Sequence, residues 1–138
     1  MTANTNPIFG RTPQVEWGGA AITAANTAKD GTGTVTTVFT ADATEGSFLQ
    51  KIVARAAGTN VASVLRVFIN NGSTNATAAN NTLFTEITLP ATTLSEVSSL
   101  VPLEIPMNIG LPAGYNINVV IGTAVAAGYY VSAVGSKY

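Results

Sequence analysis

The sequence predicts an all-β protein that folds as a single antiparallel β-sandwich of about eight strands. Apolar and polar residues alternate with a period of two through most of the chain, and no window keeps the i, i+3, i+4, i+7 pattern of a helix over about three turns. Turn-forming residues recur about every 8 to 12 residues. A length of 138 residues fits one domain. This periodicity is shared by the jelly roll and the immunoglobulin-like sandwich, so it leaves the strand order open.

Three expected strands come first, separated by polar turns. The region Gln14–Ala25 contains Gly18 and Gly19, which indicate a bulge or a close backbone approach. A turn at residues 29–33 precedes the strand Thr34–Ala41, and a second turn at residues 42–46 precedes Ser47–Ala57. We therefore expect these strands to be joined by short surface turns.

The fourth expected strand, Val61–Asn70, has the clearest alternation in the chain. Leu65 and Val67 share one face, while Arg66 and Phe68 point to the other. Residues 71–81, rich in Asn, Ala and Thr, form the longest expected loop.

Four more strands are expected after this loop. The strand Thr82–Leu89 ends at a proline, and Leu100–Met107 contains prolines, which are typical of an edge strand. A tight turn at residues 111–114 leads into Tyr115–Gly122, and Tyr129–Gly135 is the last strand. The sandwich domain is thus expected to span residues 15–138.

Residues 1–14 are expected to form an extended N-terminal arm, because two prolines flank the apolar pair Ile8 and Phe9. Such an arm either packs on its own domain or contacts a neighbouring molecule. Its candidate contact residues are Ile8, Phe9 and Arg11. The first ten residues contain no basic n-region, so we expect no secretory signal.

Charged residues make up only 9% of the chain, against about 25% in typical globular domains, and the net charge is −1. Six basic residues are too few for a nucleic-acid-binding patch, and 46% hydrophobic residues exclude intrinsic disorder. The uncharged stretch 105–136 is broken by Pro, Gly and Asn, so it predicts strands rather than a membrane helix. With no His and no Cys, the usual zinc sites, thiolate or imidazole catalysis and disulfides are excluded.

The carboxylates give no clear sign of catalysis. Four of them, at Asp30, Asp42, Glu45 and Glu96, fall in expected turns, where carboxylates accept local backbone hydrogen bonds. The turn oxygens could serve a weak calcium site, but they lack the alternating carboxylates of a dedicated loop. We therefore expect a protein that is not an enzyme, and we assign no catalytic, cofactor-binding or metal-binding residue.

Two charged residues lie in the middle of expected strands. If Val61–Asn70 and Thr82–Leu89 pair antiparallel with Phe68 opposite Phe84, then Arg66 lies opposite Glu86. This register predicts a cross-strand ion pair beside an aromatic pair.

Four aromatic residues are candidates for an interface: Trp17, Tyr115, Tyr129 and Tyr130. Core or interface packing is the role we expect for them. The alternative is a sugar-stacking platform, which needs exposed aromatic rings beside Asn or Asp side chains.

Two stretches resemble phage-encoded virion proteins of about this size. The first runs from Gly58 through Val64–Gly72, and continues with Asn81–Phe84 and Glu86. The second, Ile105–Pro106 and Leu111–Tyr115 followed by two strands, resembles the closing strands of small viral jelly-roll domains. Together they cover about half of the chain, and they favour the jelly roll over the immunoglobulin-like fold.

The resemblance implies a head decoration (cement) protein of a tailed phage. Such a protein is made in the host cytoplasm, assembles as a homotrimer, and binds the major capsid protein of the assembled shell, with no nucleic acid, membrane or cofactor involved. The main alternative is a tail, fibre or baseplate accessory domain that binds a host surface glycan. An enzyme and a bacterial surface or pilus subunit are further alternatives.

Overall fold

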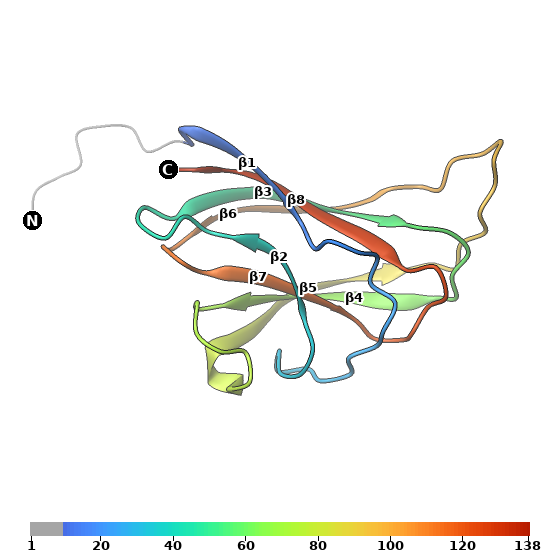
Figure 1. Cartoon of the computed structure of the whole chain (residues 1–138), viewed down its shortest axis with the longest axis horizontal. Helices are drawn as coiled ribbons and strands as arrows, with labels where there is room; N and C mark the ends of the chain where they lie inside the picture. The colour runs from blue at the N-terminus through green and yellow to red at the C-terminus, as the bar shows by residue number, and fades with distance from the viewer. Residues whose placement is uncertain (1–9) are drawn as a thin grey trace, which may run out of the picture.

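The structure, a computed structural model, describes residues 10–138 and is shown in Figure 1. These residues form eight strands and one short 3-10 helix, which confirms the all-β prediction. No helix among them is long and apolar enough to cross a membrane. The elements are β1 (Thr12–Trp17), β2 (Thr36–Thr40), β3 (Ser47–Ala56), β4 (Ser63–Asn70), η1 (Ala78–Asn80), β5 (Asn81–Leu89), β6 (Leu103–Leu111), β7 (Asn116–Ile121) and β8 (Tyr129–Lys137).

The strands form two antiparallel four-stranded sheets that pack face to face (Figure 1). One sheet has the order β1-β8-β3-β6 and the other has the order β2-β7-β4-β5. The pairs β1 with β8, β2 with β7, β3 with β6 and β4 with β5 are nested along the chain. The chain is thus one long hairpin wound into two sheets, which is the connectivity of a jelly roll.

The first strand begins earlier in the chain than expected and also ends earlier. β1 starts at Thr12, inside the range expected for the arm, and it ends at Trp17 rather than near Ala25. The chain then leaves the sheet, and Ile22 and Ala25 form only isolated bridges. The Gly18–Gly19 pair therefore marks the departure from the sheet, and Gly19 takes a φ of +85° that favours glycine.

The sixth strand confirms the expected edge position. β6 runs from Leu103 to Leu111 at one edge of its sheet. Pro106 has no backbone N–H, and at the edge this breaks no hydrogen bond between the inner strands. Its register with β3 shifts between Leu49 and Lys51, where Met107 and Asn108 of β6 lie opposite the single residue Gln50, which indicates a bulge in β6.

The core lies between the two sheets and is built from the alternating inward residues of both. β7, in the middle of its sheet, is buried along nearly its whole length. The largest fully buried side chains are those of Tyr129, Phe39, Phe68, Leu49, Ile52, Leu65, Leu89, Ile117, Ile121, Val38, Val67 and Val119.

One of these residues, Phe68, is buried outside the main core. It lies on the outer face of β4, on the side opposite to Leu65 and Val67, and it is fully buried. In Figure 1 two loops, residues 18–35 and 71–80, lie below this sheet. We infer that these loops cover Phe68.

Asparagine side chains tie the two loops together. Asn75 Nδ2 donates to the carbonyl oxygens of Gly31 at 3.1 Å and Gly33 at 2.8 Å. Asn81 Nδ2 lies 3.2 Å from the carbonyl oxygen of Asp30 and 3.0 Å from that of Asn75. A Cβ at Gly31, where φ is +79°, would come within 2.6 Å of Asn81 Cβ. Side-chain hydrogen bonds therefore hold the loop of residues 71–80 and the start of β5 to the turn at residues 29–33.

Candidate interaction surfaces

Among the described residues, no loop covers the outer face of the sheet β1-β8-β3-β6 where β1 and β8 lie side by side (Figure 1). Val15 and Trp17 of β1 are 58% and 68% exposed, and Tyr130 of β8 is 56% exposed. The register pairs Trp17 with Ser132, two residues along β8 from Tyr130. The two aromatic side chains are therefore diagonal neighbours on one surface. We call Val15, Trp17 and Tyr130 the aromatic face.

A cation borders the aromatic face. Arg55 of β3 is exposed and lies directly opposite Tyr130 in the β3–β8 register. A cross-strand pair of this kind brings a guanidinium within reach of an aromatic ring. The remaining outward positions near it include Val53 and Ser132, which pair with each other. The Lys51–Glu104 ion pair lies on the same outer face, because Lys51 pairs with Val134 and Glu104 pairs with Val53. The aromatic face is thus bordered by the cation Arg55 and by this internally neutralised pair.

The other two candidate aromatic residues lie inside the domain. Tyr129 is 1% exposed, and its hydroxyl donates to the carbonyl oxygen of Pro90 at 3.3 Å. Burial raises the pKa of the Tyr129 phenol. Tyr115 is half-buried against the core. Of the four predicted interface residues, the structure brings only Trp17 and Tyr130 together on a surface.

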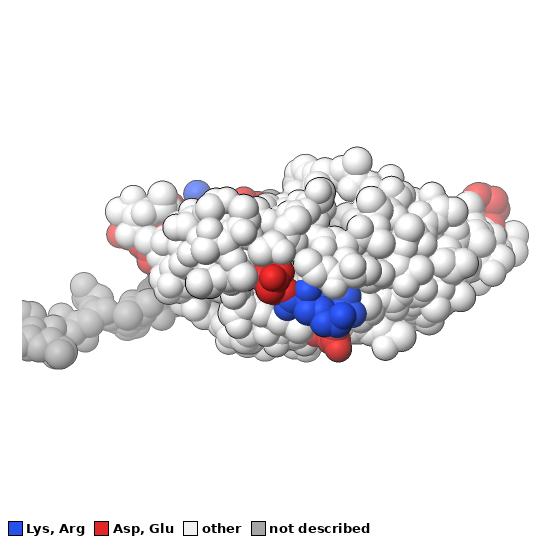
Figure 2. Space-filling model, turned by 90° about the horizontal axis from the view of Figure 1, so that it is seen from below, with Lys and Arg blue, Asp and Glu red and all other residues white. Residues whose placement is uncertain are grey.

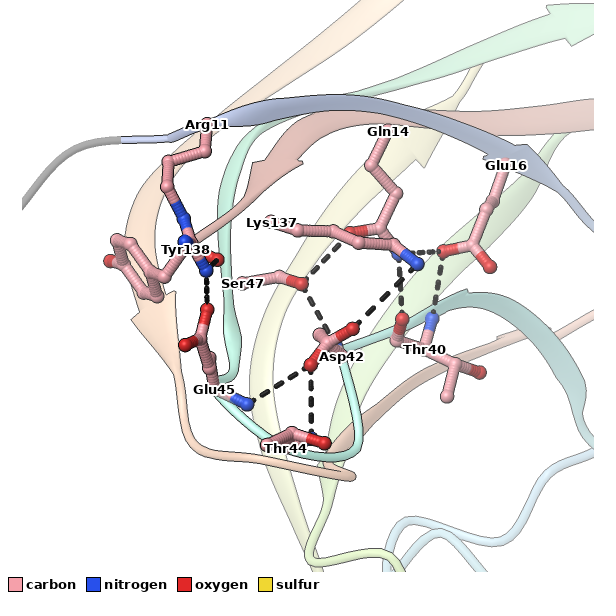
Figure 3. Close-up of polar contacts among 10 residues, drawn as sticks. All are labelled: Arg11, Gln14, Glu16, Thr40, Asp42, Thr44, Glu45, Ser47, Lys137 and Tyr138. Atoms are coloured by element: carbon pink, nitrogen blue, oxygen red, sulfur yellow. Dashed lines mark hydrogen bonds and ion pairs between the residues drawn. The ribbon is translucent and has the colours of Figure 1, made fainter.

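Polar side chains gather at the end of the sandwich where residues 1–9 join it (Figure 3). Arg11 forms an ion pair with Glu45 and donates a hydrogen bond to the carbonyl oxygen of Tyr138 at 2.8 Å. Lys137 Nζ lies 3.7 Å from Asp42 Oδ2. These contacts join the start of β1, the β2–β3 turn and the end of β8. Arg11 is thus held by the domain.

The two apolar arm residues assigned as contacts, Ile8 and Phe9, lie outside the described residues. Gly10 is the first residue described, and a Cβ there would collide with the side chain of Ser136 on β8. The point where the arm leaves the domain is therefore fixed at this end of β8.

Gln14 forms the buried part of the same polar cluster (Figure 3). Its amide nitrogen donates to the Thr40 carbonyl and to Glu16 Oε2, each at 2.7 Å. Its amide oxygen accepts a hydrogen bond from the Ser47 hydroxyl at 2.8 Å. A residue expected at the boundary of the arm thus bridges the two sheets.

The predicted cross-strand ion pair is present. Arg66 lies opposite Glu86, and Arg66 Nε is 3.2 Å from Glu86 Oε2. The predicted aromatic pair beside it is wrong, because the register shifts after Val67 and Phe68 lies opposite Leu83. Phe84 is the extra residue of this bulge and is 45% exposed.

The charged side chains are few and mostly paired. Figure 2, seen from below, shows one group of basic and acidic side chains near the centre of this face and a few further charged side chains towards its ends. Four of the six cations are in ion pairs, the fourth pair being Lys51 Nζ with Glu104 Oε1 at 3.2 Å. The surface therefore offers little charge for recognising a polyanion or a strongly charged partner.

Two of the four turn carboxylates, Asp30 and Asp42, accept local backbone hydrogen bonds as expected. Asp30 Oδ1 accepts hydrogen bonds from the hydroxyl and amide of Thr32, which lower the pKa of Asp30. Asp42 Oδ1 accepts from the amides of Thr44 and Glu45. Within residues 10–138, no group of three or more Asp or Glu side chains is placed to hold a metal ion.

The loop between β5 and β6, residues 90–102, carries a second apolar surface. Three of its large apolar side chains are exposed: Leu94 by 53%, Val97 by 97% and Val101 by 78%. Between this loop and the sandwich lies a cavity of about 400 Å³. Its lining residues are Ala56, Pro90, Ala91, Thr92, Thr93, Ser99, Leu100, Val101, Leu103 and Tyr129.

Sequence reasoning missed this cavity, because it treated the end of the segment as strand. A sequence signal was present, since large apolar residues without strict alternation lie between Pro90 and Pro102.

Comparison of the chain with protein-family models, curated proteins and solved structures finds no match. The jelly roll is shared by capsid proteins, lectins and cupins, so the fold alone does not specify a function. The surfaces described above are the features that bear on it.

Proposed function

We propose that the chain is a non-enzymatic structural protein of a phage virion, which binds the assembled capsid and stabilises it as a decoration protein. It acts as a homotrimer on the capsid surface, and its partners are sister copies and the major capsid protein. The observation that carries the proposal is the aromatic face, where Trp17 and Tyr130 are exposed on a part of the sheet that no described loop covers. Exposed aromatic clusters of this kind are typical of protein contacts.

The scarcity of free charge supports a contact of this type. Most cations of the domain are neutralised by partners within the same chain. Desolvating such a surface costs less than desolvating a charged one, so apolar burial can supply the binding energy. A protein that binds only the assembled shell stabilises that state by mass action, and an oligomer gains further from effective concentration.

The test is to purify particles of the virus that encodes the chain, carrying W17S/Y130S in place of the native residues. We expect the occupancy of the chain on particles to fall by about 30-fold at limiting concentration, the loss typical of removing a binding hot spot. The matched control is V61S/F84S, which truncates two exposed apolar residues outside the aromatic face. Native occupancy of W17S/Y130S would contradict the proposal, as would absence of the native chain from purified particles.

A second candidate is a glycan-binding accessory domain of a tail, fibre or baseplate. The observation that favours it is the diagonal pair of Trp17 and Tyr130 beside Arg55, because flat aromatic rings next to a hydrogen-bond donor suit a sugar ring. Titration of the purified chain with host surface polysaccharide separates the two candidates. Saturable binding that W17S abolishes, together with unchanged shell occupancy, would favour the glycan-binding function.

A further inference from the structure

The cavity beneath residues 90–102 has the properties of a binding pocket for apolar side chains. Its volume of about 400 Å³ falls within the range of ligand pockets. None of its lining residues is charged, and the interior is formed by Ala56, Leu100, Leu103 and the ring of Tyr129. Hydroxyl groups of Thr92, Thr93 and Ser99 contribute the polar part. An uncharged, mainly apolar occupant therefore fits.

The loop that roofs the pocket is anchored at its beginning. Thr92 exchanges backbone hydrogen bonds with Asn60, and the Leu94 amide donates to the Thr59 hydroxyl at 3.0 Å. Beyond this anchor, the exposed side chains of Val97 and Val101 extend the apolar surface. The pocket and its roof form one continuous apolar site at this end of the sandwich.

The chain contains an uncharged segment with adjacent large apolar residues, Ile8 and Phe9, in the nine residues that precede the described part. Gly10 is fixed beside Ser136, whereas the pocket contains Tyr129, seven residues back along β8. That separation is about 23 Å at the rise of a strand. Ile8 is only two residues from Gly10, a reach of about 7 Å. Neither apolar residue can therefore fill the pocket of its own copy.

We propose that the pocket receives Ile8 and Phe9 of a second copy of this chain. The two halves of this contact lie at opposite ends of the molecule, with the arm leaving at one end and residues 90–102 projecting at the other (Figure 1). A contact between two different patches is heterologous, so it closes into a ring when the rotation between copies fits and otherwise grows as an open chain. This contact is the one that joins sister subunits on the capsid, and its place there rests on the proposed function.

The experiment uses the absence of cysteine from the native chain. The variant N6C/V101C places one thiol on the arm, where it leaves Ile8 and Phe9 intact, and one on the rim of the pocket. Under mild oxidation of the purified protein we expect covalent multimers to form about 100-fold faster than by random collision, because docking raises the effective thiol concentration from micromolar to near millimolar. A single closed species indicates a ring, and a ladder indicates an open chain.

The control N6C/F84C carries its second thiol at an exposed position of β5 outside the pocket lining. Equal linking rates in the two variants, or no linking in either, would overturn the inference. Introducing A91W into N6C/V101C fills the pocket from its rim, and we expect it to remove the fast reaction while the melting temperature shows that the domain remains folded.

A second, independent experiment uses the variant I8N/F9N and a dye that fluoresces in apolar pockets, 1-anilinonaphthalene-8-sulfonate. We expect dye fluorescence to rise severalfold when the arm no longer occupies the pocket, and the A91W substitution to cancel the rise. Unchanged fluorescence would show that the pocket takes another occupant and would overturn the inference. These measurements use the purified protein and need no virion. If they fail, capsid binding through the aromatic face is still tested separately, by the occupancy of the chain on particles.

Discussion

Arg66 of β4 and Glu86 of β5 form an ion pair in which the two side chains differ in burial. The Arg66 side chain is only 15% exposed, whereas that of Glu86 is 55% exposed. A Cβ at Gly122 would lie 3.0 Å from Arg66 Nη1, so the guanidinium lies against the end of β7. A largely buried cation depends on its partner more than an exposed cation does, because less water is available to replace the carboxylate.

The substitution E86Q is expected to lower the free energy of unfolding by about 1 kcal/mol, since it removes the charge that faces the half-desolvated guanidinium. Urea denaturation at neutral pH measures the loss. The matched control is E104Q, which removes the acid from the more exposed pair with Lys51 and should cost only a few tenths of a kcal/mol. Equal losses in the two variants would mean that burial of Arg66 does not strengthen its pair.

The Arg66–Glu86 contact also separates what the sequence can predict from what it cannot. Antiparallel pairing across the loop of residues 71–80 was enough to place these two residues opposite each other. The bulge at Phe84 was not predictable, because an extra residue leaves the alternation on either side almost intact. The expected Phe68–Phe84 pair is therefore absent, although the neighbouring Arg66–Glu86 pair is present.

The adjacent residues Tyr129 and Tyr130 illustrate a second limit. Alternation requires their side chains to point to opposite faces of β8, but it does not decide which one enters the core. Hydrogen bonding of the Tyr129 hydroxyl to Pro90 depends on the path of the loop after β5, which no local pattern specifies. The surface containing Trp17 could thus be identified only from the fold.

Asn81 is expected to be the most sensitive of the loop asparagines. N81A removes donors to the carbonyls of Asp30 and Asn75 and leaves the Asn70 amide without its acceptor at 2.8 Å. We expect a loss of about 2 kcal/mol, together with faster hydrogen exchange of amides in residues 29–33. N71A is the matched control, because its side chain is exposed and contacts only Asn80 and Ser73 within the described structure. Native exchange rates in N81A would show that other contacts hold the loops.

The boundary of the N-terminal arm can be tested by two deletions. Removing residues 1–9 leaves every contact among the described residues in place, so at a protein concentration too low for the proposed contact between copies the urea midpoint should stay near that of the full chain. Removing residues 1–14 also deletes the Arg11–Glu45 pair, half of β1 and the buried amide of Gln14, and it should cost at least about 3 kcal/mol. Q14A alone should cost about 1 to 3 kcal/mol, because the Ser47 hydroxyl and the Thr40 carbonyl lose a partner. A stable product of the longer deletion would contradict the assignment of residues 12–14 to the domain.

The buried phenol of Tyr129 predicts a loss of stability at alkaline pH. Burial raises its pKa above the unfolded value of about 10, so on raising the pH the unfolded chain releases this proton first. The unfolded state then binds fewer protons than the folded state, and the free energy of unfolding falls as pH rises above about 10. Below that pH both states hold the proton, and the phenol contributes no pH dependence.

Y129F removes this ionisation. At neutral pH it should cost about 1 kcal/mol for the lost hydrogen bond to the Pro90 carbonyl. Urea midpoints from about pH 8 to pH 11 should then fall less steeply than in the native chain. Y130F, which removes an exposed phenol, is the matched control. The charged residues are the same in all three proteins, so their contributions cancel in the comparison. If Y129F and the native chain lose the same stability across this range, the hydroxyl of Tyr129 must reach water in the folded protein.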